Sequence, residues 1–310
     1  SLYMENFETY VSPNIEKIES FRQSILGFNP VEEVKDIWKD INSTEMLKSN
    51  IRTIKRFFVS NNDSFPGFGN IGKTRVFFLK MKAAIKRYIY YFLTEYFVFY
   101  EKEITSEPFV YFPLHLQPEA TLLSTTPVFS DQLSIIRALS ASIPAGYRLA
   151  IKDYPLQSGY RPLSFYRQIK KLPNVILHHR LFPSLKLVEQ CKIVVTIQGS
   201  VGFEALLRNK KVLLLGKAIY ESIYGIKHLK DYKDLQYTIK KFLFKDLDIN
   251  RQNKSMMAYL GAWSDILYRA SDYPEYQNDE IASASHRLIT LLQKHLQFDD
   301  NKEIAHVQQK

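Results

Sequence analysis

The chain has almost no cysteine and no long uninterrupted apolar run. Cys191 is its only cysteine, so an intrachain disulfide is excluded and a reducing compartment is favoured; its place at the start of an apolar run predicts a buried, inert thiol. The longest apolar stretch, residues 88–100, contains Thr94 and Glu95 and is too short to cross a bilayer, which takes roughly twenty residues. The first residues lack the pattern of a secretory signal peptide. We therefore expect a cytoplasmic protein.

Other signatures of known chemistry are also missing. No cysteine–histidine cluster of zinc-binding spacing occurs, and His178 and His179 are adjacent, so on a strand they point to opposite faces and cannot share a metal. We expect no metal site. The G-x-S-x-G sequence of serine hydrolases is absent as well.

Charge of one sign is in excess. Lysine and arginine number 42 against 32 acidic residues, a net charge of +10 that favours phosphates, nucleotides, anionic lipids or polyanionic glycans as partners. The basic residues are spread along the chain and no nucleic-acid-binding motif is present, so nucleic acid is not an expected partner.

Three regions are predicted along the chain. Residues 1–105 are expected to be mainly helical, residues 106–235 to alternate strands and helices, and residues 236–310 to form C-terminal helices and a polar tail. The middle region predicts a Rossmann-like parallel sheet with ligands at the carboxyl ends of its strands. Its expected strands are 109–116, 148–152, 175–179, 192–198 and 211–216, its expected helices 131–141, 163–171, 184–189 and 201–208, and further helices are expected at 227–244 and 256–296.

A long helix is also expected over residues 75–100, basic in its first half and aromatic in its second. The simpler interpretation is a solvated basic face and a buried aromatic face. The alternative is a patch that rests on an anionic membrane surface.

The sequence Gln198-Gly199-Ser200 stands between a β-branched apolar run and a helical pattern. Such a junction directs the backbone N–H groups of the first helical turn toward the strand's end, where a phosphate fits. Glu204, about one turn into the helix, is a candidate to accept hydrogen bonds from sugar hydroxyls. The alternative is an ordinary Rossmann-like turn without a ligand.

Polar side chains follow two other expected strands. His115, Gln117 and Glu119 come after the first, and Lys152 and Tyr154 end the second. Parallel strands end at one edge of the sheet, so these groups are expected to converge on one crevice. His115, with a pKa near neutrality, and Glu119, if burial raises its pKa, are candidates for acid–base catalysis, and ordinary polar loop residues are the alternative.

Segments 111–120, 164–166 with 173–175, and 196–207 together resemble the bacterial capsule polysaccharide biosynthesis family, which includes Kdo-transferase-like glycosyltransferases of GT-B type. The resemblance implies a GT-B fold whose C-terminal lobe binds a nucleotide-sugar, typically a CMP-activated acidic sugar. It places the family's Gln-Pro motif on Gln117-Pro118 and the nucleotide phosphate near Gly199-Ser200.

The chain departs from the family pattern in three places. Lys152-Asp153-Tyr154-Pro155 has tyrosine where the family has a histidine expected to contact the donor phosphate; Tyr154 donates a hydrogen bond but brings no positive charge. Gln198 stands where a small hydroxyl residue is common. Residues 1–105 do not have the pattern of a second Rossmann-like lobe, so either an acceptor lobe lies outside this sequence or the chain is a reduced homologue.

The leading hypothesis is a glycosyltransferase of capsule or surface polysaccharide biosynthesis, with CMP-Kdo or another CMP-sugar as donor and a glycan or glycolipid as acceptor. Gly199 and Ser200 would hold the phosphate, Glu204 the ribose and Lys152 would supply positive charge. No cofactor or metal is required, because a helix N-terminus and cations can stabilise the leaving phosphate. The expected location is the cytoplasm, at the inner face of the membrane.

Two other functions stay open. One is a non-catalytic homologue that acts as a binding or scaffold protein in capsule assembly. The other is a P-loop enzyme that uses a nucleoside triphosphate, because Gly67–Thr74 matches G-x-x-x-x-G-K-T. Pro66 next to the first glycine breaks the strand that a P-loop needs, so a flexible glycine-rich loop before a basic helix is the alternative for this segment.

Overall fold

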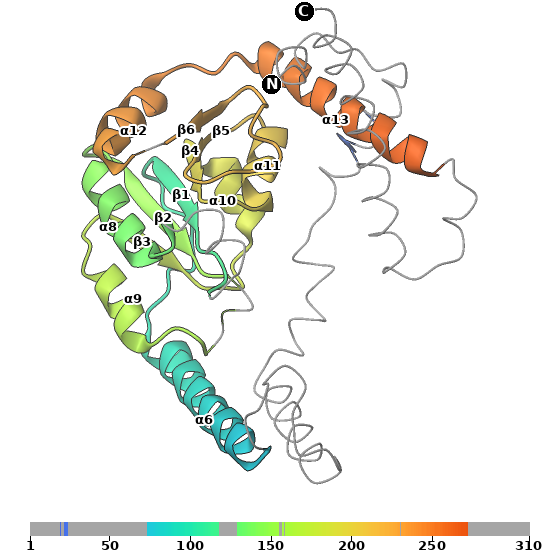
Figure 1. Ribbon diagram of the computed structural model, residues 1–310. Helices are drawn as coiled ribbons and strands as arrows, with labels where there is room; N and C mark the ends of the chain where they lie inside the picture. The colour runs from blue at the N-terminus through green and yellow to red at the C-terminus, as the bar shows by residue number, and fades with distance from the viewer. Residues whose placement is uncertain are drawn as a thin grey trace, which may run out of the picture. The chain divides into compact units, whose positions relative to one another are not determined.

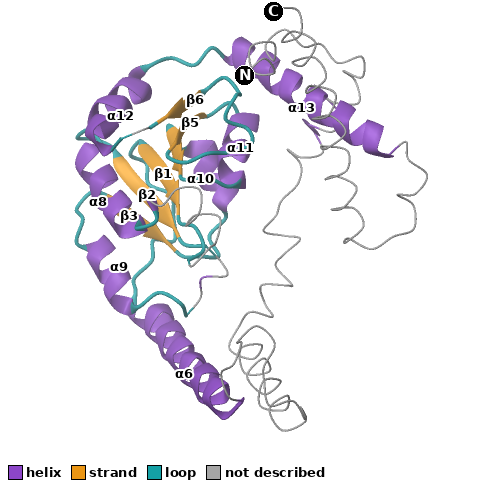
Figure 2. Ribbon diagram, viewed as in Figure 1, coloured by secondary structure: helices purple, strands orange, loops and turns teal. Residues whose placement is uncertain are grey.

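The computed structural model describes residues 19, 22–23, 73–117, 129–154, 157, 159–229 and 231–271. Residues 21–256 belong to one compact unit, and Ser1–Ser20 with Met257–Lys310 belong to another. The first unit contains a six-stranded parallel sheet with helices on both faces (Figures 1 and 2).

All strand pairs in this sheet are parallel, and their order is β3-β2-β1-β4-β5-β6. This is the order of the dinucleotide-binding Rossmann sheet. The central strands are buried along their whole length, as expected for a parallel sheet covered on both faces. The predicted α/β, Rossmann-like class is therefore confirmed. The strands are β1 (Phe109–Pro113), β2 (Arg148–Lys152), β3 (Val175–His178), β4 (Ile193–Thr196), β5 (Lys211–Leu214) and β6 (Ile226–His228).

The helices form two layers (Figure 1). One layer contains α8 (Gln132–Ser142), α9 (Leu163–Lys170) and α12 (Leu235–Phe244), and the other contains α10 (Ser184–Gln190) and α11 (Ser200–Leu207). In the first layer α8 packs against α9 and α12, while in the second α11 packs on β4 and β5. Asp131 is the N-cap of α8, and its side chain accepts a hydrogen bond from the backbone N–H of Leu133.

Two elements after residue 220 differ from the sequence expectation. The helix predicted to begin at residue 227 is wrong in its first part, because Ile226–His228 form β6 and pair with the open edge of β5. The short 3₁₀ helix η3 (Tyr232–Asp234) follows, and only then does α12 begin. The last described helix, α13 (Ile249–Ser271), includes the first part of the predicted helix 256–296, and the remainder lies outside the described residues.

Helix α6 (Lys73–Phe97) confirms the long helix expected before the sheet, and it packs against α9. The expected burial of its aromatic face is wrong: the side chain of Tyr96 is 71% exposed and that of Phe78 is 63% exposed. The side of the helix that is buried holds Val76 and Thr94 instead. Within the described residues, no helix combines the length and apolar content that spanning a bilayer demands.

Cys191 is buried at the end of α10, where its thiol donates to the carbonyl of Val188. The prediction of a buried cysteine is confirmed, and burial raises the pKa of its thiol to about 12.

Candidate functional site

The sheet reverses its winding direction between β1 and β4. From β1 the chain proceeds to β2 and β3 on one side, and from β4 it proceeds to β5 and β6 on the other. In open α/β sheets, ligands bind in the crevice outside the carboxyl ends of the strands at this switch point. The residues that follow the two strands here are His115 after β1 and Gln198-Gly199-Ser200 after β4.

The turn after β4 depends on glycine. Gly199 has φ +106°, a conformation that costs other residues strain, and it is the N-cap of α11 without a side-chain capping hydrogen bond. A Cβ at this position would lie 3.4 Å from Cε1 of His115. The hydroxyl of Tyr220 donates to the carbonyl of Gly199. Exposed Ser200 is the first residue of α11 and follows the glycine turn directly.

The ring of His115 joins the ends of β1 and β4. Its Nε2 lies 3.2 Å from Oγ1 of Thr196 and 3.4 Å from the backbone nitrogen of Ile197. The Thr196 hydroxyl also donates to the carbonyl of Gln198 at 2.8 Å. Burial, together with the charge of Arg161, lowers the pKa of His115 to about 4. The expectation that this histidine titrates near neutrality is therefore wrong, because it did not take burial into account.

A buried guanidinium, absent from the sequence expectations, organises the loop after β1. Arg161 is 5% exposed, and its Nε lies 3.2 Å from Oδ1 of buried Asp153. Its Nη1 donates to Oε1 of Gln117 at 2.8 Å, and its Nη2 donates to the carbonyl of His115 at 2.6 Å. Asp153 also accepts the hydroxyl of Tyr166. One side chain thus links the ends of β1 and β2 to the segment before α9.

Two glutamines complete this network. Gln132 of α8 accepts the N–H of His115 at 2.9 Å and donates to its carbonyl at 3.1 Å. Gln157 accepts the N–H of Gln117 at 2.7 Å and donates to its carbonyl at 2.9 Å. Since the side chain of Gln117 is itself bonded to Arg161 and to the carbonyl of Ser130, it holds the loop in place. Gln117 is therefore a positioning residue in this structure.

Lys152 is a second buried cation. Its Nζ donates to Oγ of Ser184 at 2.7 Å. Burial lowers the pKa of Lys152 to about 8, although the carboxylates of Asp153 and Glu204 act in the opposite direction. Tyr111 hydrogen-bonds to the same serine, and burial raises the pKa of its hydroxyl. The ammonium of Lys152 thus lies within the protein, between the end of β2 and α10.

The structure brings some of the predicted site residues together and places others apart. Half-buried Gln198 and exposed Gly199 and Ser200 lie at the switch point with His115, whereas half-buried Glu204 acts on Lys152 from α11. Tyr154 follows β2, and its side chain is 40% exposed. Glu119 lies outside the described residues. The network residues that the sequence analysis missed are Arg161, Asp153, Gln132 and Gln157. The one sign of this network in the sequence was the acidic residue directly after β2.

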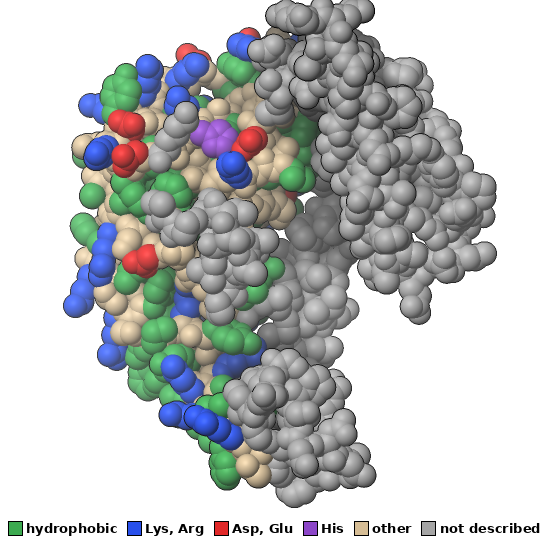
Figure 3. All heavy atoms as spheres, viewed as in Figure 1, with side chains coloured by type: hydrophobic (Ala, Val, Ile, Leu, Met, Phe, Trp, Pro, Cys, Tyr) green, Lys and Arg blue, Asp and Glu red, His purple; other side chains and the backbone are tan. Residues whose placement is uncertain are grey.

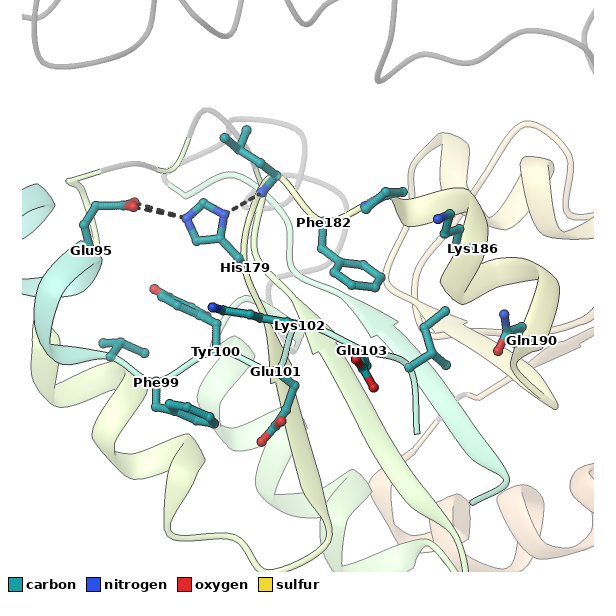
Figure 4. Close-up of a pocket in the computed structure, with 14 residues that line it drawn as sticks. Glu95, Phe99, Tyr100, Glu101, Lys102, Glu103, His179, Phe182, Lys186 and Gln190 are labelled. Carbon is teal, nitrogen blue, oxygen red and sulfur yellow. Dashed lines mark hydrogen bonds and ion pairs between the residues drawn. The ribbon is translucent and has the colours of Figure 1, made fainter. Parts of the chain in front are cut away.

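A groove of 990 Å³ lies beside β3, the edge strand on the other side of β2 (Figure 4). In Figure 4 the side chains of Glu95 and His179 point toward one another, and the rings of Tyr100 and Phe182 line the space. Glu95 Oε2 lies 3.2 Å from Nε2 of His179, and Glu95 Oε1 accepts from Arg180 Nε at 3.1 Å. Burial acts to raise the pKa of Glu95, but the hydrogen bond from His179 and the charge of Arg180 outweigh it and lower that pKa.

The two adjacent histidines have separate partners, as predicted. His178 Nδ1 lies 3.1 Å from the carbonyl of Glu101 and its ring packs against Phe182, whereas His179 contacts Glu95. In the part of the chain that the structure describes, no three His, Cys, Asp or Glu side chains gather as metal ligands.

The strand order and the crevice define an α/β domain of the Rossmann type. Residues 24–246 match the family described as capsule polysaccharide biosynthesis protein, and the chain belongs to this family. It is 31% identical over 120 residues to the capsule polysaccharide export protein KpsS of Escherichia coli, a match that covers 36% of this chain and 30% of KpsS.

Two solved structures are loosely similar. One is the β-Kdo 2,7-transferase KpsC of Thermosulfurimonas dismutans, with a TM-score of 0.35 and 12% identity over 66% of this chain and 57% of that one. The other is the spinosyn rhamnosyltransferase SpnG with spinosyn aglycone, with a TM-score of 0.36 and 14% identity over 54% of this chain and 47% of that one. The chain thus matches less than two thirds of the length of each of these relatives.

We predict that Arg161→Leu lowers the free energy of unfolding by about 3–5 kcal/mol, because it leaves the Asp153 carboxylate buried without its cation. Urea denaturation measures the change. Arg148→Leu is the matched control: its ion pair with Glu107 is exposed, and its loss costs at most about 1 kcal/mol. Adding Asp153→Asn to Arg161→Leu should recover part of the loss. Equal losses for the two arginine variants would contradict this assignment.

A second prediction concerns His115 and pH. Its folded-state pKa of about 4 lies below the ordinary value of 6.5, so between these pH values the unfolded chain binds the proton and the folded chain does not. This histidine's contribution to stability is thus present above pH 6.5 and falls on acidification by about 1.4 kcal/mol per pH unit. His115→Gln should flatten the pH dependence of unfolding in this window, and the surface variant His228→Gln should keep it. An unchanged profile in His115→Gln would refute the prediction.

Proposed function

We propose that this chain is the donor-binding part of a glycosyltransferase of GT-B type that acts in capsule or surface polysaccharide biosynthesis. The observation that carries the proposal is the switch-point crevice, where the Gly199 turn and the start of α11 meet the ring of His115. Membership of the capsule polysaccharide biosynthesis family supports it. A Rossmann-type lobe with a glycine turn at this place suits a nucleotide phosphate.

The donor in this proposal is a nucleotide-sugar, with CMP-Kdo or another CMP-sugar as first candidate. Its phosphate would lie at the amides of Gly199 and Ser200. Transfer breaks the bond between the anomeric carbon and the phosphate oxygen, forms a bond from that carbon to an acceptor hydroxyl, and requires the hydroxyl to lose its proton. The helix start stabilises the departing phosphate without a metal ion or cofactor.

Several side chains have assigned roles in this chemistry. At neutral pH His115 is uncharged, so it serves as a hydrogen-bonding group rather than as a cation. Glu119 is the proposed base, and Tyr154 the hydrogen-bond donor that stands in for the family's histidine. Glu204 is the proposed contact of the ribose. Lys152 would supply positive charge to the site without touching the donor.

The acceptor is a glycan or glycolipid. The groove beside β3 is its proposed site, because aromatic rings together with carboxylate, amide and ammonium groups suit hydroxyl-rich molecules. The proposal includes a cytoplasmic location at the inner membrane surface, which agrees with the buried reduced cysteine and the net positive charge.

The second candidate is a non-catalytic binding or scaffold protein of capsule assembly. The family resemblance implies a histidine where Tyr154 stands, and the ammonium of Lys152 is bonded to Ser184; both points favour this candidate. The third, a P-loop enzyme, stays a prediction, since α6 begins at Lys73 while residues 67–72 lie outside the described residues.

We predict that calorimetric titration detects saturable CMP binding and that Gly199→Ala weakens it at least tenfold. Alanine at φ +106° is strained by about 1–2 kcal/mol, and its Cβ would be in van der Waals contact with His115. Gly146→Ala is the matched control, because it has φ +82° but nothing within 4 Å of its added Cβ, and it should bind CMP like the parent chain.

Equal CMP binding by the two glycine variants would place the nucleotide elsewhere. Titrations with UDP, GDP and ATP complete the test. ATP binding that Lys73→Ala abolishes would favour the P-loop alternative, and no binding of any nucleotide would favour the scaffold protein.

Tyr154→His tests catalysis itself. If the protein is an enzyme weakened at this position, the variant should release CMP from a CMP-sugar roughly tenfold faster or more, since a positioned acid adds a proton-transfer contribution to leaving-group departure. Tyr154→Phe is the control for the hydroxyl and should be slower than the parent. No turnover in any of the three proteins would support the scaffold protein.

A further inference from the structure

Helix α6 carries an exposed apolar stripe along its length. Phe78, Met81, Ile85, Tyr88 and Phe92 recur at alternating spacings of three and four residues, so they lie on one face of the helix. In Figure 3 hydrophobic and basic side chains cover the lower part of the described surface, over α6. We call this face the α6 stripe; its exposed members are Phe78, Met81, Ile85, Tyr88, Ile89, Phe92 and Tyr96.

The opposite face of α6 makes the contacts with the rest of the compact unit. Val76 and Thr94 are buried on it, and the Thr94 hydroxyl donates to the carbonyl of Tyr90. The guanidinium of Arg87 lies 4.3 Å from the ring centroid of Tyr160, and a Cβ at Gly159 would collide with the Arg87 backbone. The α6 stripe is therefore the side that faces away from the sheet domain.

The charged residues of α6 beside the stripe are all basic. Lys82 lies one helical turn from both Phe78 and Ile85, and Lys86 lies one turn from Ile89. The single acidic residue of α6 is Glu95, and it is paired with His179 and Arg180. The stripe is apolar and bordered by lysines, and the helix has no unpaired carboxylate. It therefore complements a partner whose outer layer is anionic and whose interior is apolar.

We propose that the α6 stripe is the surface by which this protein docks on an anionic lipid bilayer, with the helix lying in the plane of the interface. Apolar side chains enter the boundary between headgroups and acyl chains, and the lysines contact the phosphates. This inference specifies the membrane contact of the proposed function and does not depend on the transferase chemistry. A second copy of the chain suits the stripe less well, because pairing two α6 helices would bring two sets of lysines together without acidic partners.

Sedimentation of the full chain with vesicles tests the docking. We expect binding to phosphatidylcholine vesicles that contain phosphatidylglycerol, and weak binding to phosphatidylcholine alone. Ile85→Ser with Phe92→Ser should weaken binding to the anionic vesicles at least tenfold. Lys82→Gln with Lys86→Gln should weaken it roughly 20-fold, with a smaller effect at high salt.

A matched control replaces two large exposed side chains elsewhere. Tyr237 and Ile249 are exposed on α12 and α13, and Tyr237→Ser with Ile249→Ser should bind vesicles like the parent chain. CMP calorimetry on the Ile85→Ser, Phe92→Ser variant reports the crevice separately, so a failure of lipid docking is distinguishable from a failure of the donor site.

Three results would overturn the proposal. One is a parent chain that does not bind anionic vesicles. Another is equal vesicle binding by the stripe variant and the Tyr237, Ile249 control. The last is a parent chain that forms dimers, if the stripe substitutions dissociate them. The stripe would then be a dimer interface between two α6 helices.

Discussion

The buried guanidinium of Arg161 is the interaction on which the candidate site depends. The loop after β1 leaves the sheet ladder, so its backbone groups need new partners, and an arginine offers several donors in a fixed plane. Arg161 binds the carbonyl of His115, the side chain of Gln117 and the carboxylate of Asp153. Arg161 and Gln132 hold the backbone of His115, and the end of β4 holds its ring near the Gly199 turn.

Much of the fold could be predicted because strands of a parallel sheet that are buried on both faces appear in the sequence as short apolar runs. The expected strand at 192–198 became Ile193–Thr196, and the expected helix at 201–208 became Ser200–Leu207. The edge strand Ile226–His228 was missed because three residues carry no periodicity. Helix α6 shows a different limit: periodicity reveals an apolar face but does not say whether that face is turned inward.

The site was predictable where it follows from topology and not where it follows from distant contacts. Strand ends had to meet at one edge, so His115 and Gly199 could be paired in advance, and the structure brings them together. Arg161 reaches back across the chain to Gln117 and Asp153, and no local pattern marks such a partner. Burial is the other quantity that the sequence does not give. It lowers the pKa of His115, whereas the residue type alone predicts a pKa near neutrality.

The buried cations near the crevice have carboxylate partners. Arg161 pairs with Asp153, and the carboxylates of Asp153 and Glu204 act on Lys152, so each of these two buried cations is offset by a carboxylate. An anion at the Gly199 turn therefore meets mainly the backbone N–H groups of α11, which act as roughly half a positive charge. Tyr154 adds a hydroxyl but no charge. In the proposed function, a nucleotide-sugar phosphate at this turn would therefore rely on hydrogen bonds from the helix start more than on a charged side chain among the described residues.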